Sequence, residues 1–321
     1  MIHRRRLIQL AAALALSPIY SASFALAPTR KAKRLVLIHG VDQQGKDPKA
    51  LKSNWMGALN RGAQAAHLQV PTSIAVAFPF YGDQLGDFEK ATTIPLTSEI
   101  HSRGSAKDDA YLQFQFDVAE EIRQRAGVTD DQINAEYGNN PEERGPLNWS
   151  WVQAILRAID KHGGGINQRT LELFTRDVYL YCTLPGVHDA INRTVAAALT
   201  EEPTVIVAHS LGSVVAYSLL TTDTRKLHVP LLVTVGSPLG VRAIRDLYRP
   251  IRSPDPVGEW FNAYDPRDVV ALYPLDNDNF PVQPPIDNYS KVKNHTDNHH
   301  GIDGYLDDPT VATHILDAIG S

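Results

Sequence analysis

Short apolar runs alternate with amphipathic stretches along most of this chain. Runs rich in Val, Ile, Leu and Phe predict strands at residues 34–38, 73–78, 204–207, 231–235 and 260–264. Stretches with apolar residues at helical spacing follow several of these runs. The first predicted helix begins at Asp47 and Pro48, which suit the N-cap and first helical positions, and the last covers residues 310–319. Strands that alternate with helices favour an α/β fold with a doubly wound, mainly parallel sheet.

One interval between predicted strands is much longer than a strand connection needs. Apolar residues in helical phase predict helices at 110–125 and 149–159, and Thr129 with Gln132 forms a capping-box pattern between them. We therefore predict an inserted helical subdomain at about 84–168. It either covers one face of the sheet or forms a lid or a wall of a substrate pocket.

The first 27 residues differ in character from the rest. Three arginines at 4–6 precede an apolar stretch at 7–18, and a region of small residues ends in Ala-Leu-Ala at 25–27. This order is typical of an export signal, and the apolar stretch is too short to span a bilayer. We predict a signal peptide or an N-terminal anchor at 1–27 and a folded domain at 28–321. We therefore expect an exported protein, periplasmic or secreted, that uses either the general or the twin-arginine route. The same segment could associate the protein with a membrane. The alternative is that residues 1–27 form a basic amphipathic helix.

Composition narrows the class of protein. The chain has 321 residues, of which 43% are hydrophobic and 21% charged, which is typical of a globular protein. Its net charge of −5 argues against binding nucleic acid through general electrostatics. Cys182 is the only cysteine, which excludes an intrachain disulfide and a multi-cysteine metal site.

The stretch 204–216 carries the clearest chemical pattern. A β-branched run ends at Ala208, then His209, Ser210, Leu211 and Gly212 lead directly into an apolar helix. A sharp strand-to-helix turn lifts a serine hydroxyl clear of the backbone, and the helix N-terminus behind it favours developing negative charge. The alternative is a purely structural role, in which the serine caps the helix. We interpret His209 as structural and expect it to point away from the catalytic base.

This turn resembles the nucleophile elbow of the α/β-hydrolase superfamily, with Ala208 in place of the usual first glycine. The resemblance covers most of residues 34–320 except the insertion. The stretch Ser-Leu-Gly-Ser-Val-Val-Ala-Tyr and the turn Gly-Ser-Pro-Leu-Gly look most like lipase-related bacterial hydrolases. The resemblance implies an α/β-hydrolase fold with Ser210 as nucleophile. His39-Gly40 after the first strand is similar to the oxyanion loop, which implies the backbone N–H groups of Val41 and Leu211 as oxyanion donors.

The same resemblance implies an acid and then a histidine downstream of the serine. It favours Asp268, just before a Val-rich stretch, while Asp265 is the alternate and could instead cap a turn. Near the C-terminus it favours His300, which precedes Gly-Tyr-Leu and Asp-Pro, with His299 as the alternate and His295 as a further competitor. The resulting order of Ser, Asp and His matches the α/β-hydrolases.

A metal site is a weaker interpretation of the same C-terminal segment. His295, Asp297, His299 and Asp303 offer imidazole and carboxylate groups, but they lack a recognised ligand spacing. We therefore predict no metal and no other cofactor.

These patterns together predict a serine hydrolase that cleaves a carboxylic ester, esterase-like or lipase-like, through an acyl-enzyme. The expected substrate is a small-molecule or lipid ester. A peptidase, an amidase or an acyltransferase would use the same triad. A non-catalytic cell-envelope binding protein on a hydrolase scaffold is the alternative from another class.

Overall fold

A six-stranded sheet, parallel throughout, forms the centre of the molecule. The computed structural model describes residues 31–92, 94–99, 106–140 and 143–320, so the expected signal at 1–27 lies outside the described residues. The strand order is β2-β1-β3-β4-β5-β6. The strands are β1 (Arg34–Ile38), β2 (Ala75–Ala77), β3 (Thr204–His209), β4 (Val229–Val235), β5 (Val257–Ala263) and β6 (Asp287–Tyr289). The predicted α/β fold with a parallel sheet is confirmed, and β6 is an addition to the predicted strands.

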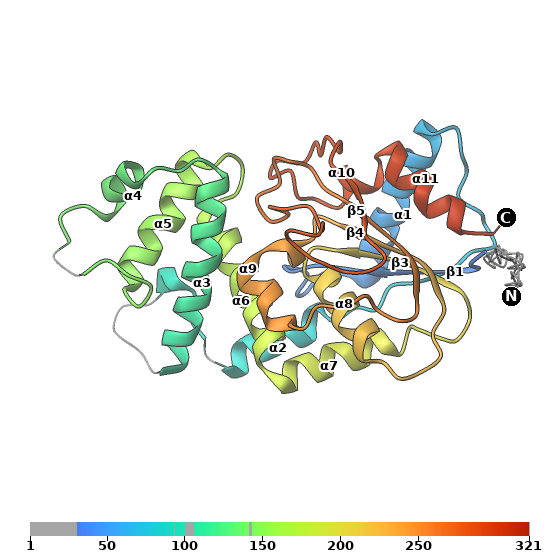
Figure 1. The fold of residues 1–321 in the computed structure, drawn as a ribbon, viewed down its shortest axis with the longest axis horizontal. Coiled ribbons are helices and arrows are strands. Elements are labelled where there is room, and N and C mark those ends of the chain that lie inside the picture. Colours follow the sequence, from blue (N-terminus) through green and yellow to red (C-terminus); the bar gives the residue numbers. More distant parts are fainter. Residues whose placement is uncertain (1–30, 93, 100–105, 141–142, 321) are drawn as a thin grey trace, which may run out of the picture.

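Helices cover both faces of this sheet (Figure 1). One face carries α1 (Pro48–Ala65), α10 (Asp303–Leu306) and α11 (Pro309–Ala318), and the other carries α2 (Gly82–Thr92), α7 (Pro185–Ala196) and α8 (Leu211–Thr222). Trp55 and Ile315 belong to the core of the first face, and Val214 belongs to that of the second. The predicted cap of the first helix is present, because the Asp47 side chain accepts the Lys49 N–H. Burial on both faces explains why the strands read as continuous apolar runs.

A long helical stretch separates β2 from β3, as predicted, but it extends beyond residue 168. It contains α3 (Ala106–Arg125), α4 (Asp130–Tyr137), α5 (Trp149–His162), α6 (Gln168–Thr183) and α7. The predicted capping box of Thr129 and Gln132 is formed at the start of α4. Figure 1 shows α3, α4 and α5 to one side of the sheet, away from both termini. None of the described helices is both long enough and apolar enough to cross a membrane.

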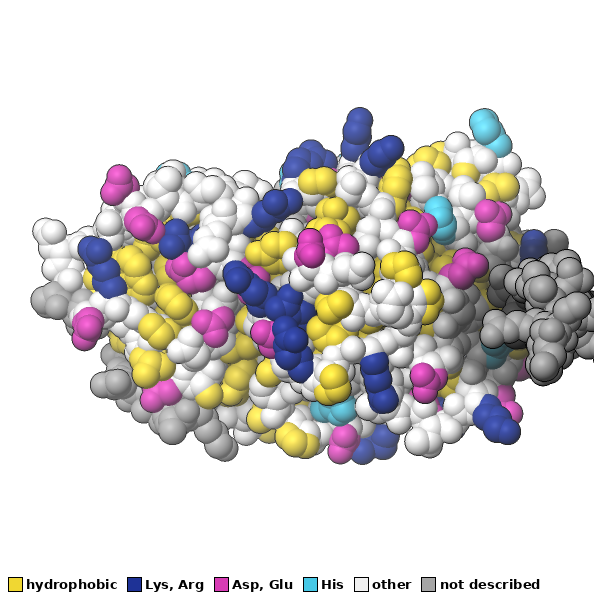
Figure 2. All heavy atoms as spheres, viewed as in Figure 1, with side chains coloured by type: hydrophobic (Ala, Val, Ile, Leu, Met, Phe, Trp, Pro, Cys, Tyr) yellow, Lys and Arg dark blue, Asp and Glu magenta, His cyan; other side chains and the backbone are white. Residues whose placement is uncertain are grey.

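Short helical turns complete the fold, and charged side chains of both signs cover it. The turns are η1 (Thr97–Glu99), η2 (Pro238–Gly240), α9 (Arg242–Arg245) and η3 (Asp246–Tyr248). On the face in Figure 2, Lys and Arg side chains gather near the middle with Asp and Glu side chains among them. Arg242 pairs with Glu121, and Arg249 pairs with Asp246. The Arg249–Asp246 pair is exposed on both sides, and such exposed pairs contribute about 0–1 kcal/mol each.

The strand order reverses between β1 and β3, at the carboxyl edge of the sheet. The chain leaves β1 toward β2 on one side, and it leaves β3 toward β4 on the other. β1 and β3 are neighbours, with Ile38 opposite Ala208. In open α/β sheets, ligands bind where the strand order reverses in this way. The loop after β1 and the turn after β3, which hold Val41 and Ser210, both lie at this position.

Candidate active site

Ser210 occupies a strained turn between β3 and α8. Its φ is 54° and its ψ is −128°, a conformation that residues with a side chain rarely adopt. The backbone N–H of Ser210 bonds to the Val235 carbonyl at 3.2 Å. Its hydroxyl does not cap the helix, since no side-chain cap hydrogen bond is formed there. The geometry therefore differs from that of a helix-capping serine.

Two glycines allow the backbone to close tightly around this turn. A Cβ at Gly212 would lie 2.4 Å from the Ile38 carbonyl oxygen and 2.5 Å from that of His39. A Cβ at Gly40 would lie 2.7 Å from the Ser210 Cβ and 3.2 Å from its Oγ. Contacts of 2.4–2.7 Å are too short for real Cβ atoms, so both positions require glycine. The loop after β1 therefore lies directly against the serine.

His39 fixes the orientation of this loop. Its Nε2 accepts the Tyr81 backbone N–H at 3.1 Å, so the ring proton is on Nδ1 and is donated to the Gly40 carbonyl at 2.8 Å. The Tyr81 hydroxyl also donates to the His39 carbonyl. Burial lowers the pKa of His39 to about 4, which keeps the ring neutral. Since the Gly40 peptide is trans, the Val41 N–H points away from the His39 ring.

Both predicted oxyanion donors lack a hydrogen-bond acceptor among the described residues. The Val41 N–H finds no acceptor within the described parts of the chain. Leu211 is the first residue of α8, so its N–H has no partner inside the helix and lies at the positive end of the helix dipole.

Asp268 and His300 form a close, buried pair. The His300 Nδ1 lies 2.7 Å from the Asp268 Oδ2. The other carboxylate oxygen accepts the backbone N–H groups of Val270 at 2.8 Å and Ala271 at 3.3 Å. The Tyr305 hydroxyl donates to Oδ2 at 2.6 Å. Asp268 is 1% exposed, and these four donors compensate its charge in place of water.

The reactive atoms of the serine and the histidine have no other engagement. The Ser210 Oγ and the His300 Nε2 are both buried and form no hydrogen bond with any described residue. The imidazole lies beside Gly236, at the end of the strand next to β3: a Cβ there would be 3.1 Å from the ring. With its Nδ1 proton directed at Asp268, the His300 ring presents a free Nε2 lone pair. The arrangement can accept a proton at Nε2.

The alternate candidates, Asp265 and His299, contact other residues. The Asp265 carboxylate accepts from the Arg267 guanidinium and from the Asn294 N–H. Burial alone would raise the pKa of Asp265, but these hydrogen bonds hold it below its ordinary value. The His299 Nδ1 is 3.0 Å from the Asn294 carbonyl. The structure thus brings Asp268 to His300 and directs both Asp265 and His299 to Asn294.

The residues of the weaker metal hypothesis are engaged elsewhere. His295 pairs with Asp307 at 2.7 Å, and Asp303 accepts from Arg61 at 2.9 Å. No group of three potential metal ligands exists among the described residues.

His209 does not point away from the base, contrary to our expectation. Its ring centroid lies 4.7 Å from that of His300, and its Nε2 is 2.7 Å from the His300 carbonyl oxygen. The strand carries the His209 side chain toward the loop before α10, a position that the local sequence does not specify. Sequence reasoning also missed the contact of Tyr305, although the Gly-Tyr-Leu motif that favoured His300 contains this residue.

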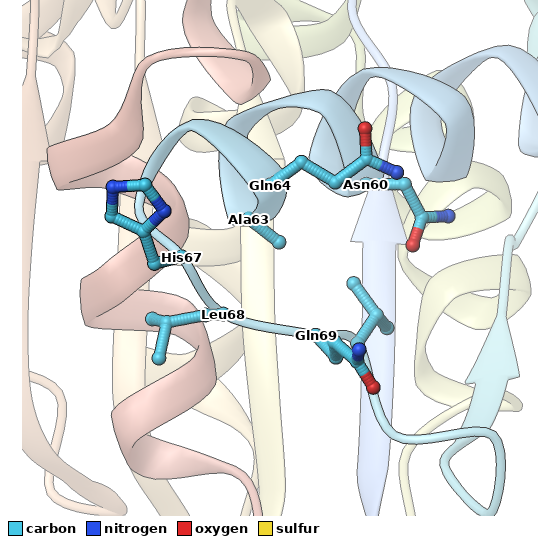
Figure 3. A pocket seen from close by; sticks show the side chains of 7 residues that line it. Asn60, Ala63, Gln64, His67, Leu68 and Gln69 are labelled. Atoms are coloured by element: carbon cyan, nitrogen blue, oxygen red, sulfur yellow. The ribbon is translucent and has the colours of Figure 1, made fainter.

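The hollow shown in Figure 3 is separate from this site. It has a volume of about 520 Å³ and is lined by Asn60, Gln64, His67 and Gln69, among others. These residues lie at the end of α1 and in the segment that leads into β2. That is the amino edge of the sheet, opposite the edge that carries Ser210.

Comparison with known proteins gives no family for this chain. No protein-family model matches it, and no curated protein matches its sequence significantly.

Proposed function

We propose that this protein is a serine hydrolase of the α/β-hydrolase type that cleaves a carboxylic ester through an acyl-enzyme. One observation carries the proposal. A serine held in a strained turn at the switch point of a parallel sheet lies at the same edge as a buried Asp–His pair with a free Nε2. Activated serine nucleophiles need a base oriented by a third group, and these residues supply all three roles.

The acylation step follows from the hydrogen-bond pattern. The Ser210 Oγ attacks the ester carbonyl carbon while the His300 Nε2 takes the hydroxyl proton. The resulting imidazolium is stabilised by Asp268, whose charge remains on the carboxylate. The carbonyl oxygen becomes an oxyanion, which the N–H groups of Val41 and Leu211 would bind. His300 then donates its Nε2 proton to the departing alcohol oxygen, and the C–O bond breaks.

Deacylation uses the same groups in reverse. His300 takes a proton from water, and the hydroxide attacks the acyl carbonyl carbon. The second oxyanion uses the same two backbone donors. Collapse breaks the bond to the Ser210 Oγ, which regains a proton from His300, and the carboxylic acid leaves.

An ester is the favoured substrate because an alcohol is easier to expel than an amine. A small-molecule or lipid ester fits a protein that we expect to be exported by residues 1–27. Peptidase, amidase and acyltransferase activities would use the same residues. A series of p-nitrophenyl esters of increasing acyl length separates these: hydrolysis supports the esterase, and cleavage of a peptide library without ester hydrolysis would replace it with a peptidase. Transfer to an added alcohol with little hydrolysis would indicate an acyltransferase.

The proposal is tested by labelling with a fluorophosphonate probe. We expect wild-type protein to be labelled and Ser210→Ala to remain unlabelled, because phosphonylation requires the activated hydroxyl. Ser218→Ala is the matched control: Ser218 lies on α8 and its Oγ is 2.8 Å from the Nε2 of His188, but it has no strained turn. Labelling of that variant should persist. No labelling of wild-type protein, or equal labelling of Ser210→Ala, would remove the serine-hydrolase proposal and favour a binding protein.

Tyr305→Phe should lower kcat by loosening the position of the Asp268 carboxylate. The Tyr305 hydroxyl and the His300 Nδ1 share the same oxygen of Asp268. Without the hydroxyl, the carboxylate loses one of the four hydrogen bonds that hold it. We expect a loss of kcat of about tenfold or less, with KM nearly unchanged, from looser positioning of the carboxylate. Tyr289→Phe, which removes a hydroxyl contact with Thr310, is the control; an unchanged kcat in Tyr305→Phe would contradict the expectation.

A further inference from the structure

The His209 side chain contacts the backbone of His300, the proposed base. Its Nε2 lies 2.7 Å from the His300 carbonyl oxygen. A carbonyl oxygen only accepts, so the His209 proton is on Nε2 and is donated to that oxygen. The two rings are 4.7 Å apart at an interplanar angle of 38°. His209 thus contacts both the backbone and the ring of the proposed base.

The His209 ring is itself held in place. It is the last residue of β3 and is in register with Val235 of β4. The Trp55 ring meets it edge-on at 6.2 Å, and the Tyr305 ring lies 6.1 Å away. Burial, and then the nearby His300, lower the pKa of His209, so the ring stays neutral at neutral pH. A neutral ring provides a hydrogen bond without placing a second positive charge beside an imidazolium.

His300 needs such an anchor because it lies in an irregular segment. Between β6 and α10 the chain has no strand ladder to hold the His300 backbone. Its N–H is bonded to the Asn298 side chain at 3.1 Å, and its ring to Asp268. The bond from His209 is the contact that ties this loop residue to the rigid sheet.

We propose that His209 is a positioning residue for His300, whose Nε2–H donated to the His300 carbonyl keeps the imidazole aligned between Asp268 and Ser210. The inference rests on the proposed serine-hydrolase function. It gives His209 a role in orienting the base, whereas a purely structural residue would affect only the stability of the fold.

A matched pair of substitutions isolates the hydrogen bond. In glutamine the side-chain nitrogen is three bonds from Cβ, as Nε2 is in histidine, so His209→Gln keeps the donor. His209→Met has nearly the same length and shape as His209→Gln but no donor. Both lose the ring equally. His314→Phe is the control, because His314 stacks on Phe261 at 3.8 Å and contacts a carbonyl on α11, away from the site.

The experiment measures the fluorophosphonate labelling rate of each purified variant, its kcat and KM for a p-nitrophenyl ester, and its unfolding in urea. We expect His209→Met to lose about 10- to 100-fold in labelling rate and in kcat, with KM nearly unchanged, because small misplacement of a base has effects of this size. His209→Gln should stay within about threefold of wild type, and His314→Phe should equal it.

Two results would overturn the inference. If folded His209→Met keeps the wild-type labelling rate and kcat, His209 has only a structural role. If folded His209→Gln falls as far as His209→Met, the ring matters and the hydrogen bond does not. Should His209→Met fail to fold, a large loss of labelling rate and kcat in folded His209→Gln would still overturn the inference. Failure of the proposed function itself is separate, since wild-type protein would then not be labelled.

Discussion

Replacing Asp268 with asparagine should lower kcat for ester hydrolysis by about 10³- to 10⁴-fold while the protein remains folded. The Oδ1 atom of Asp268 accepts the N–H groups of Val270 and Ala271. In Asp268→Asn the amide oxygen would keep those bonds, and the amide nitrogen would face the His300 Nδ1. Because that nitrogen is a donor, His300 must move its proton to Nε2. A protonated, neutral Nε2 cannot accept the Ser210 proton.

Asp265→Asn is the matched control for this experiment. Asp265 is equally buried but is bonded to Arg267 and Asn294, not to a histidine of the proposed triad. We expect it to lower the free energy of unfolding and to leave kcat within a few-fold of wild type. The measurement is kcat and KM for a p-nitrophenyl ester together with urea unfolding. Retention of more than about a tenth of the activity in Asp268→Asn, or an equal loss in Asp265→Asn, would reverse the assignment of the acid.

The second large effect is expected from Gly212→Ala, which should destabilise the fold by about 3 kcal/mol. The added methyl group would lie 2.4 Å from the Ile38 carbonyl oxygen. The two nearest atoms, the carbonyl oxygens of Ile38 and His39, belong to the backbone, so either the chain at the end of β1 or α8 must move. Such a shift would also separate the loop that holds Val41 from Ser210, and the remaining folded protein should react more slowly with the fluorophosphonate.

Gly57→Ala on α1 provides the opposite outcome for comparison. The nearest atom to a Cβ there is the Arg61 Nη1 at 3.7 Å, the end of a flexible side chain. Alanine is the better helix former by about 1 kcal/mol, so this variant should be slightly more stable than wild type. Chemical unfolding of both variants measures the difference. Equal stability of Gly212→Ala and wild type would show that the close approach of strand and helix is not required.

The central strands and the serine turn were predictable because their signals are local. β1, β3 and β4 are buried on both faces, so each is a nearly continuous apolar run in the sequence. β6 has the sequence Asp-Asn-Tyr and lies at the edge of the sheet, with no apolar pattern to reveal it. α6 was missed because Glu172 and Asp177 are buried in it, which interrupts the apolar stripe.

The partners around the serine were less predictable because they depend on loops. Residues 264–302 contain little regular structure, and hydrophobic periodicity says nothing about how they fold back. The contacts of Asn294 with Asp265 and His299 distinguish these from Asp268 and His300, and only the folded chain shows them. The prediction for His209 was wrong for the same reason, since its partner is the backbone of that loop.

The place of the long helical stretch has a consequence for the order of folding. β1 pairs with β3 across the whole of that stretch, so Gly40 and Ser210 meet only when a very long loop closes. The contacts within and between α3, α4 and α5 span much shorter stretches of chain than the pairing of β1 with β3, and contacts of shorter range form faster. Once formed, they shorten the flexible chain between the two strands and reduce the entropy lost on closure. Assembly of the helical stretch is therefore expected to precede the pairing of β1 with β3, and the geometry around the serine to be among the last features that a refolding chain acquires.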